Sequence, residues 1–251
     1  MLLAYFTSNS NLIPNFVINP PPDFDANLII DAQGHTSLHW AAAMANIDMV
    51  NLLIKAGADA ESSNIVGETA LMRSVMFPYN YQNRSFKNII QLLARSIGSV
   101  DSRDQTVFHH IAVFANSSKI QEEPAKYYLE ILISQLTQLP DEKYRKSILN
   151  RQNVDGDTAI NILAKAKNKQ LVELIYRAGG DLHIFTTVTA NNKVYTATPT
   201  VDSFVPIGKQ ILEDLRSPYV GELERNASKI TREKSAYKKT DESYKRKNRK
   251  A

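Results

Sequence analysis

The sequence contains no cysteine, which excludes disulfide bonds and any zinc or redox centre built on thiolates. It has no apolar run long enough to cross a bilayer. The first lysine or arginine is Lys55, so the apolar N-terminus lacks the basic flank of a cleaved secretory signal. From these absences we expect an intracellular protein that does not act at a membrane.

The short motifs of common enzymes are absent too. The chain has no G-x-G-x-x-G or G-x-x-x-x-G-K-[ST] phosphate loop and no G-x-S-x-G nucleophile elbow. Its five histidines lack H-E-x-x-H spacing and have no cysteine with which to share a metal ion. We therefore expect no catalytic residue, no cofactor and no metal site, and we expect that the chain is not an enzyme.

The excess of positive over negative charge is confined to the C-terminus. The net charge is +4, yet residues 229–251 hold ten Lys or Arg against three Asp or Glu, which leaves the first 228 residues at −3. Gripping a phosphate backbone requires cations clustered on one face, so we expect no direct nucleic-acid contact from this chain's body. The densest basic cluster is a candidate nuclear-import signal, although such runs also occur in solvated tails, and it consists of Lys245, Arg246, Lys247, Arg249 and Lys250.

Four threonines mark a repeated unit. Each stands two residues after a turn residue and opens a short apolar helical run, and they are Thr36, Thr69, Thr106 and Thr158. The segments GHTSLHWAA and GETALMRSV match the ankyrin signature, a turn followed by T-P-L-H-x-A with a period of 33 residues. The observed spacings are 33, 37 and 52 residues, so the longer intervals contain insertions. We predict an all-α fold, an ankyrin-repeat solenoid of about four repeats with inserted helices or loops in repeats 2 and 3.

The other segments flank this ankyrin-repeat domain, which we place at 31–182. Residues 1–30 carry four prolines and little charge, so we predict an extended lead-in, rather than a helix, that covers the end of the first repeat. We predict that 183–225 caps the other end and that it starts with a loop or hairpin. Residues 226–251 are expected to form a basic tail that is disordered or at most a solvated helix.

His39 and His109 occupy the histidine position of the ankyrin signature. The requirement at this position is a side chain that hydrogen-bonds the adjacent turns, so we predict a structural role for both. A metal or catalytic role would need partners converging on the imidazoles, and none is indicated by the spacing.

An insertion in the second repeat gathers aromatic side chains around an arginine. Its candidate partner-binding residues are Phe77, Tyr79, Tyr81, Arg84 and Phe86. Aromatic residues and arginine are enriched at the hot spots of protein interfaces, which makes this insertion a candidate contact. The alternative, which we weigh more heavily, is that the rings fold back and cover neighbouring helices.

The repeat region resembles the central ankyrin region of the fungal cell-cycle box transcription factors, the MBF and SBF subunits, and most closely the DNA-binding subunit of the MBF type. The resemblance covers 18–182 and rests on INPPPDFDANLIIDAQGHTSLHWAAAMAN (18–46), GETALMRSVMFPYNYQNRSF (67–86), TVFHHIA (106–112) and AKYYLEILI (125–133). It implies a scaffold in a nuclear regulator, with shuttling to the cytoplasm possible, that controls genes at the G1-to-S transition. The implied partners are the other subunit of the transcription complex and cell-cycle regulators.

In that family the ankyrin block lies between an N-terminal winged-helix DNA-binding domain and a C-terminal region that pairs with the partner subunit. No segment here matches that DNA-binding domain, so we expect a middle fragment of a longer protein. The family pattern supplies no catalytic residues. The alternative function is a generic cytoplasmic ankyrin adaptor unrelated to transcription.

Overall fold

The structure is a computed structural model that describes residues 2–8, 12–184, 187–190 and 193–196. Our predictions for 226–251, including the basic cluster Lys245, Arg246, Lys247, Arg249 and Lys250, lie outside the described residues, as does most of 183–225. Within the described part, no helix combines the length and the apolarity needed to span a membrane.

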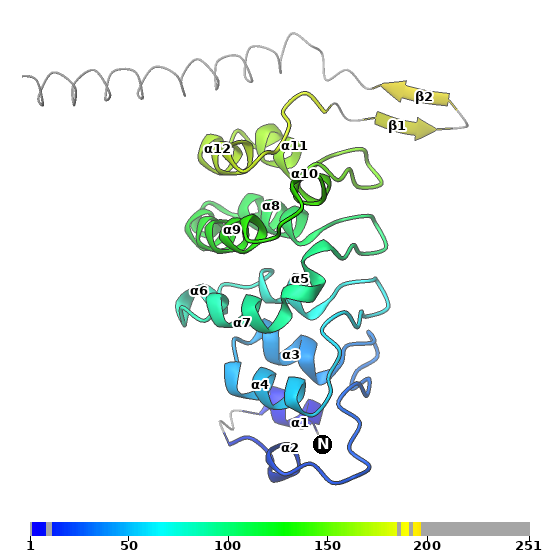
Figure 1. Ribbon diagram of the computed structural model, residues 1–251, viewed down its shortest axis with the longest axis vertical. Helices are drawn as coiled ribbons and strands as arrows, with labels where there is room; N and C mark the ends of the chain where they lie inside the picture. The colour runs from blue at the N-terminus through cyan, green and yellow to red at the C-terminus, as the bar shows by residue number, and fades with distance from the viewer. Residues whose placement is uncertain (1, 9–11, 185–186, 191–192, 197–251) are drawn as a thin grey trace, which may run out of the picture. The chain divides into compact units, whose positions relative to one another are not determined.

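Four helix pairs stack one upon the next (Figure 1). The pairs are α3 (Ser37–Ala43) with α4 (Ile47–Lys55), α5 (Ala70–Ser74) with α7 (Phe86–Leu93), α8 (Val107–Ser117) with α9 (Glu122–Thr137), and α11 (Ala159–Lys165) with α12 (Lys169–Arg177). First helices pack on first helices and second helices on second helices, as in α3 on α5 and α7 on α9. The predicted ankyrin solenoid of four repeats is confirmed.

The first helix of every repeat begins at one of the four threonines. A threonine at the N-cap satisfies a backbone amide that has no partner within the helix. Reciprocal capping boxes join Thr36 to His39, Thr106 to His109 and Thr158 to Asn161, while Thr69 accepts from the amide of Met72. Local chemistry therefore sets where each helix starts.

An Asp or Asn five residues before each threonine shapes the turn. Its Oδ1 accepts the amides two and four residues further on, and these residues are Asp31, Asn64, Asp101 and Asn153. Three of the turns use a glycine at positive φ two residues before the threonine, whereas Asp104 takes this conformation in the third repeat with φ 57°. Neighbouring turns are joined through the backbone, for example by the amide of Ile65 to the carbonyl of Gln33 at 3.1 Å.

The insertions contribute short additional elements. They are α6 (Tyr79–Gln82) and η1 (Ala94–Gly98) in the second repeat and η2 (Lys119–Gln121) and α10 (Glu142–Leu149) in the third. The first helix of the second repeat stops at Ser74, and Pro78 then takes the N-cap of α6, where its missing N–H costs nothing.

Residues 1–30 are not uniformly extended, and our expectation of a lead-in without helix is wrong. The segment forms α1 (Leu2–Thr7) and α2 (Asn15–Ile18). Pro14 precedes the first turn of α2, a position that proline tolerates. Helices this short depend on tertiary packing for their stability. Phe6 of α1 supplies such packing, because it is buried and stacks on Trp40 with ring centroids 6.1 Å apart.

Two strands follow the last repeat, β1 (Thr187–Ala190) and β2 (Lys193–Thr196). They pair antiparallel, with Thr187 opposite Thr196. The hairpin was one of the two structures that we expected at the start of 183–225, and the capping role of that segment stays a prediction.

Candidate protein-binding site

The aromatic insertion of the second repeat is anchored by a buried asparagine. Asn80 is fully buried, and its Nδ2 donates to the carbonyl oxygens of Ala42 at 2.8 Å and Ser74 at 3.0 Å. Its Oδ1 accepts from the hydroxyl of Ser85 at 2.6 Å. Both functional groups of the amide are thus used, and α6 is tied to the first repeat as well as to its own.

Tyr128 of α9 anchors the same insertion from the third repeat. Its hydroxyl donates to the carbonyl of Phe77 at 2.7 Å and accepts from the amide of Tyr81 at 2.9 Å. Burial raises the pKa of Tyr128 far above that of an exposed tyrosine, so the hydroxyl keeps the proton that it donates. The backbone of the insertion is therefore fixed at two points.

The structure divides the five candidate partner-binding residues into two groups. Phe86 is fully buried, edge-on against Tyr128 at 4.9 Å. Tyr81 is half-buried, and the guanidinium of Arg84 lies 4.4 Å from its ring centroid. These three residues lie on the third-repeat side of the insertion.

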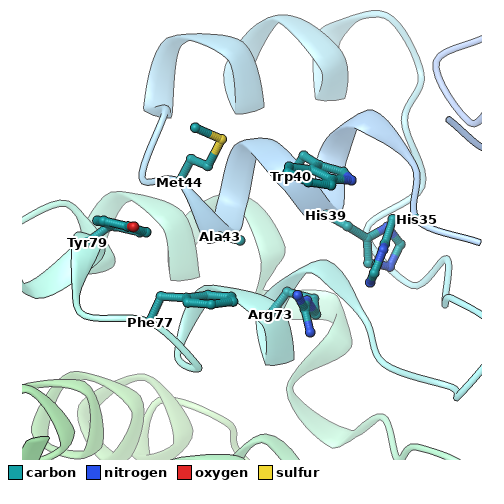
Figure 2. A pocket seen from close by; sticks show the side chains of 8 residues that line it. All are labelled: His35, His39, Trp40, Ala43, Met44, Arg73, Phe77 and Tyr79. Carbon is teal, nitrogen blue, oxygen red and sulfur yellow. The ribbon is translucent and has the colours of Figure 1, made fainter. Parts of the chain in front are cut away.

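Phe77 and Tyr79 face the other way, towards the first repeat. Their rings stack at 6.2 Å and form one wall of a cavity of about 260 Å³ (Figure 2). The opposite wall consists of Trp40 and Ala43 of α3 and of Met44, which caps the C-terminus of this helix. Tyr79 is 47% exposed and Met44 is 41% exposed, so apolar surface remains open to solvent on both walls.

A hydrogen-bonded network closes one end of this cavity. Asp31 Oδ2 accepts from the indole of Trp40 and from His35 Nδ1, both at 2.8 Å. On the other side of the imidazole, Asn64 Nδ2 donates to His35 Nε2 at 2.9 Å and also to Glu68 Oε2 at 2.8 Å. Asp31 Oδ2 and Glu68 Oε2 are thus occupied by internal donors.

The charge state of this end follows from burial and hydrogen bonding. Burial raises the pKa of Asp31, but the amide of His35, the indole of Trp40 and the His35 ring outweigh it and lower the pKa to about 2. Burial lowers the pKa of His39 to about 4, so its imidazole is neutral at neutral pH. Arg73 completes this end, with Nη1 3.2 Å from Glu68 Oε2 and its guanidinium carbon 5.3 Å from the Phe77 ring centroid.

The histidines of the repeat signature link neighbouring repeats. Nε2 of His39 donates to the carbonyl of Glu68, and Nε2 of His109 donates to the carbonyl of Asp157, both at 3.0 Å. Nδ1 in each ring accepts from the threonine amide at 3.1 Å, which fixes the tautomer. In the fourth repeat Asn161 stands at this position and donates to the carbonyl of Ile184. The described residues contain no group of three or more His, Asp or Glu that could hold a metal ion.

Sequence reasoning missed most of the cavity walls. Trp40 and Met44 stand four and eight residues after Thr36, and Arg73 and Phe77 stand at the same offsets after Thr69. Equivalent positions of stacked repeats lie on one face, so comparing the repeats position by position could have brought these four side chains together. The anchors carry no such signal, because Asn80 lies in the insertion and Tyr128 reaches it from α9 of another repeat.

The chain matches an ankyrin-repeat family model and is similar to several fungal proteins. The family model described as ankyrin repeats (3 copies) matches residues 1–98. The chain is 44% identical to the cell division cycle-related protein res1/sct1 of Schizosaccharomyces pombe, over 69% of this chain and 27% of that protein. It is 36% identical to the transcription factor MBP1 of Saccharomyces cerevisiae, over 65% of this chain and 20% of that protein.

A further fungal protein and one solved structure are also similar to this chain. The start control protein cdc10 of Schizosaccharomyces pombe is 37% identical, over 64% of this chain and 22% of that protein. Among solved structures, the ankyrin-repeat fragment of Swi6 from Saccharomyces cerevisiae has a TM-score of 0.60 at 28% identity, over 68% of this chain and 73% of that one. The chain spans about a quarter of the length of these curated relatives.

Proposed function

We propose that the chain belongs, through its ankyrin-repeat region, with the fungal cell-cycle transcription factors of the MBF/SBF type, and that it is a protein-interaction scaffold of a nuclear transcription factor that controls genes at the G1-to-S transition. The observation that carries this proposal is the 44% identity, over 69% of this chain, with a cell division cycle-related protein. That similarity favours the transcriptional role over a generic cytoplasmic adaptor.

The kind of activity follows from the fold. Stacked repeats present extended surfaces on which other proteins bind, and they need no catalytic group to do so. The proposed partners are the second subunit of the transcription complex and cell-cycle regulators. No direct DNA contact is proposed for the repeats, because several of their surface arginines pair with carboxylates, as Arg103 does with Asp155 at 2.7 Å and Arg95 with Glu61 at 3.6 Å.

Affinity capture from fungal nuclear extract tests this function. The immobilised chain is expected to retain the partner subunit of a cell-cycle box complex or a cyclin-type regulator, identified by mass spectrometry. An unrelated ankyrin stack with the same number of repeats serves as the matched control. Recovery of the same proteins on both stacks, or of cytoplasmic proteins alone on this chain, would contradict the proposal.

A further inference from the structure

We propose that the N-terminal end of the repeat stack is a docking surface for an extended segment of a partner protein that carries Lys or Arg beside apolar residues. The segment lays its apolar side chains in a groove formed within residues 2–30, pairs its cations with Asp23 and Asp25, and offers a backbone carbonyl to the amide of Ala32. This inference rests on the proposed scaffold function and names the chemistry of one of its partners.

A ladder of backbone hydrogen bonds joins the turns of the stack and is open at its N-terminal end. In each later repeat, the amide four residues before the threonine donates to a carbonyl of the preceding turn, and the pairs are Ile65 with Gln33 at 3.1 Å, Ser102 with Val66 at 2.9 Å and Val154 with Arg103 at 2.9 Å. The equivalent residue of the first repeat is Ala32, which is exposed and whose amide donates to no residue that the structure describes. Since the equivalent amides point to the preceding turn, the amide of Ala32 points out of the N-terminal end of the stack. A carbonyl of an added segment can therefore continue the ladder, as when a peptide adds to the open edge of a sheet.

An apolar groove lies beside this open end, because Ile30, which lines it, is two residues from Ala32. The groove has a volume of about 580 Å³, and its walls come from α1, α2 and residues 21–30 at the N-terminal end of the stack (Figure 1). On these walls the ring centroids of Phe16 and Phe24 lie 6.2 Å apart. Leu28 and Ile29 are 59% and 61% exposed, so contact with an apolar partner removes their surface from water.

Contacts with the first repeat fix the walls of the groove. Asn27 donates through Nδ2 to the carbonyl of Gly57 at 3.1 Å and accepts through Oδ1 from the amide of Asp59 at 2.7 Å. On α1, the hydroxyl of Tyr5 accepts from Asn46 Nδ2 at 2.9 Å, and α2 packs on α4. Because these elements are already ordered, a bound segment does not have to supply the free energy of ordering them.

The charge of this end selects a basic segment. Residues 1–61 hold six acidic residues against one basic residue, and these are Asp23, Asp25, Asp31, Asp48, Asp59 and Glu61 against Lys55. Asp23 and Asp25 line the groove and are exposed, and neither forms an ion pair with any residue that the structure describes. Asp25 accepts the amide of Asn27 through Oδ1 at 2.8 Å, which leaves its charge without a countercharge. Cations of a partner therefore meet two carboxylates that no internal cation neutralises.

The same charge disfavours other occupants of the groove. Carboxylates repel the phosphates of nucleic acid and of an anionic membrane. In a symmetric dimer the same patch of both copies comes together, so the two carboxylates of each groove would meet those of the other without a cation between them.

The probe is a phage-displayed library of random peptides. The library is first depleted on an immobilised Ile29→Ser variant, which removes peptides that bind elsewhere on the chain, and is then selected on the unchanged chain. We expect the enriched peptides to combine Lys or Arg with Leu, Ile, Val or Phe. Binding of synthesised, fluorescein-labelled copies is measured by fluorescence anisotropy.

Matched variants locate the binding on the groove. Ile29→Ser should weaken it about tenfold or more, as for the loss of a large apolar contact, whereas Ile120→Ser changes an isoleucine that is 82% exposed on η2 and should leave it unchanged. Asp23→Asn should weaken it about two- to fivefold, the effect of one exposed ion pair. Glu130→Gln removes the same charge from an exposed position of α9 and should have no effect. Melting temperatures establish that the variants keep the fold, and Leu28→Ser takes the place of Ile29→Ser if that variant unfolds.

Hydrogen exchange followed by NMR tests the ladder. In the chain alone the amide of Ala32 is expected to exchange fast, whereas the amides of Ile65, Ser102 and Val154 are protected by their bonds to the preceding turn. A saturating peptide should slow the exchange of the Ala32 amide by about tenfold or more, because the amide gains a hydrogen-bond acceptor.

Several results would overturn the proposal. They are the survival of no peptide after depletion, surviving peptides that lack Lys and Arg, equal effects of Asp23→Asn and Glu130→Gln, and an Ala32 amide that exchanges as fast in the complex as in the chain alone. Self-association of the chain that Ile29→Ser abolishes would identify a second copy as the occupant instead. If no peptide survives while nuclear extract still yields the expected regulators, the groove inference fails and the scaffold function stands. Groove-binding peptides together with an extract that yields no regulator would reject the G1-to-S assignment alone.

Discussion

The hydroxyl of Tyr128 provides the sharpest test of how the insertion is held. Tyr128→Phe keeps the ring, which packs on Phe86 and on Phe114 with centroids 4.9 Å and 6.1 Å away, and removes a single oxygen atom. The carbonyl of Phe77 and the amide of Tyr81 then lose their partner. Each unpaired buried group costs about 1–3 kcal/mol. Water reaches both half-buried residues in part, so we expect the lower end for each and a total loss of about 2 kcal/mol.

Urea unfolding measures this loss. Circular dichroism reports on the helices of all repeats, and Trp40 fluorescence reports on the first repeat, so both midpoints are expected to fall together if the stack unfolds as one unit. Tyr176→Phe is the control, because Tyr176 is 39% exposed and surface changes are usually worth less than about 0.5 kcal/mol.

A loss below about 0.5 kcal/mol for Tyr128→Phe would refute the reasoning. That result would mean that the two backbone groups find other partners and that the hydroxyl does not fix the insertion.

Three further predictions concern a turn, a buried imidazole and the tail. Lys167 has φ 59°, a left-handed conformation that costs a non-glycine residue about 1–2 kcal/mol. Glycine avoids this cost but raises the entropy of the unfolded chain, which offsets about 0.4–1 kcal/mol. Lys167→Gly should therefore raise the free energy of unfolding in urea by about 0.5–1 kcal/mol, and no gain would contradict this. His39 has a pKa of about 4 in the folded chain, against 6.5 for an exposed histidine. As the pH falls, the unfolded state therefore takes up this proton before the folded state does. The contribution of His39 to the free energy of unfolding is complete above pH 6.5 and decreases by about 3 kcal/mol as the pH falls to 4. Unfolding midpoints measured across that pH range should fall less steeply for His39→Gln. Asp31 does not contribute to the fall in this range, because its proton uptake affects stability only below its ordinary pKa of 3.8. A passive reporter fused to residues 226–251 should accumulate in the nucleus through the cluster at 245–250, and a cytoplasmic reporter would reject the import signal.

The parts of the fold that could be predicted from the sequence depend on local chemistry. Thr36 and its three equivalents start helices because a side-chain oxygen caps the next few amides, and this signal needs no knowledge of the rest of the chain. The N-terminal segment was predicted wrongly because α1 depends on tertiary contacts such as that of Phe6 with Trp40. The cavity could not be predicted from the insertion alone, since half of its wall comes from α3, which precedes the insertion by more than thirty residues in the chain.

The insertion also compensates for a local departure from the repeat pattern. His39, His109 and Asn161 each donate to a carbonyl of the following segment, but the equivalent position of the second repeat is Met72, which has no donor. At that junction the polar side-chain link comes instead from Tyr128, which reaches from the third repeat to the backbone of the insertion. Buried polar groups require partners, so this link holds the insertion close to the stack. The link uses the backbone of Phe77 and not its ring, and the rings of Phe77 and Tyr79 line the cavity towards the first repeat.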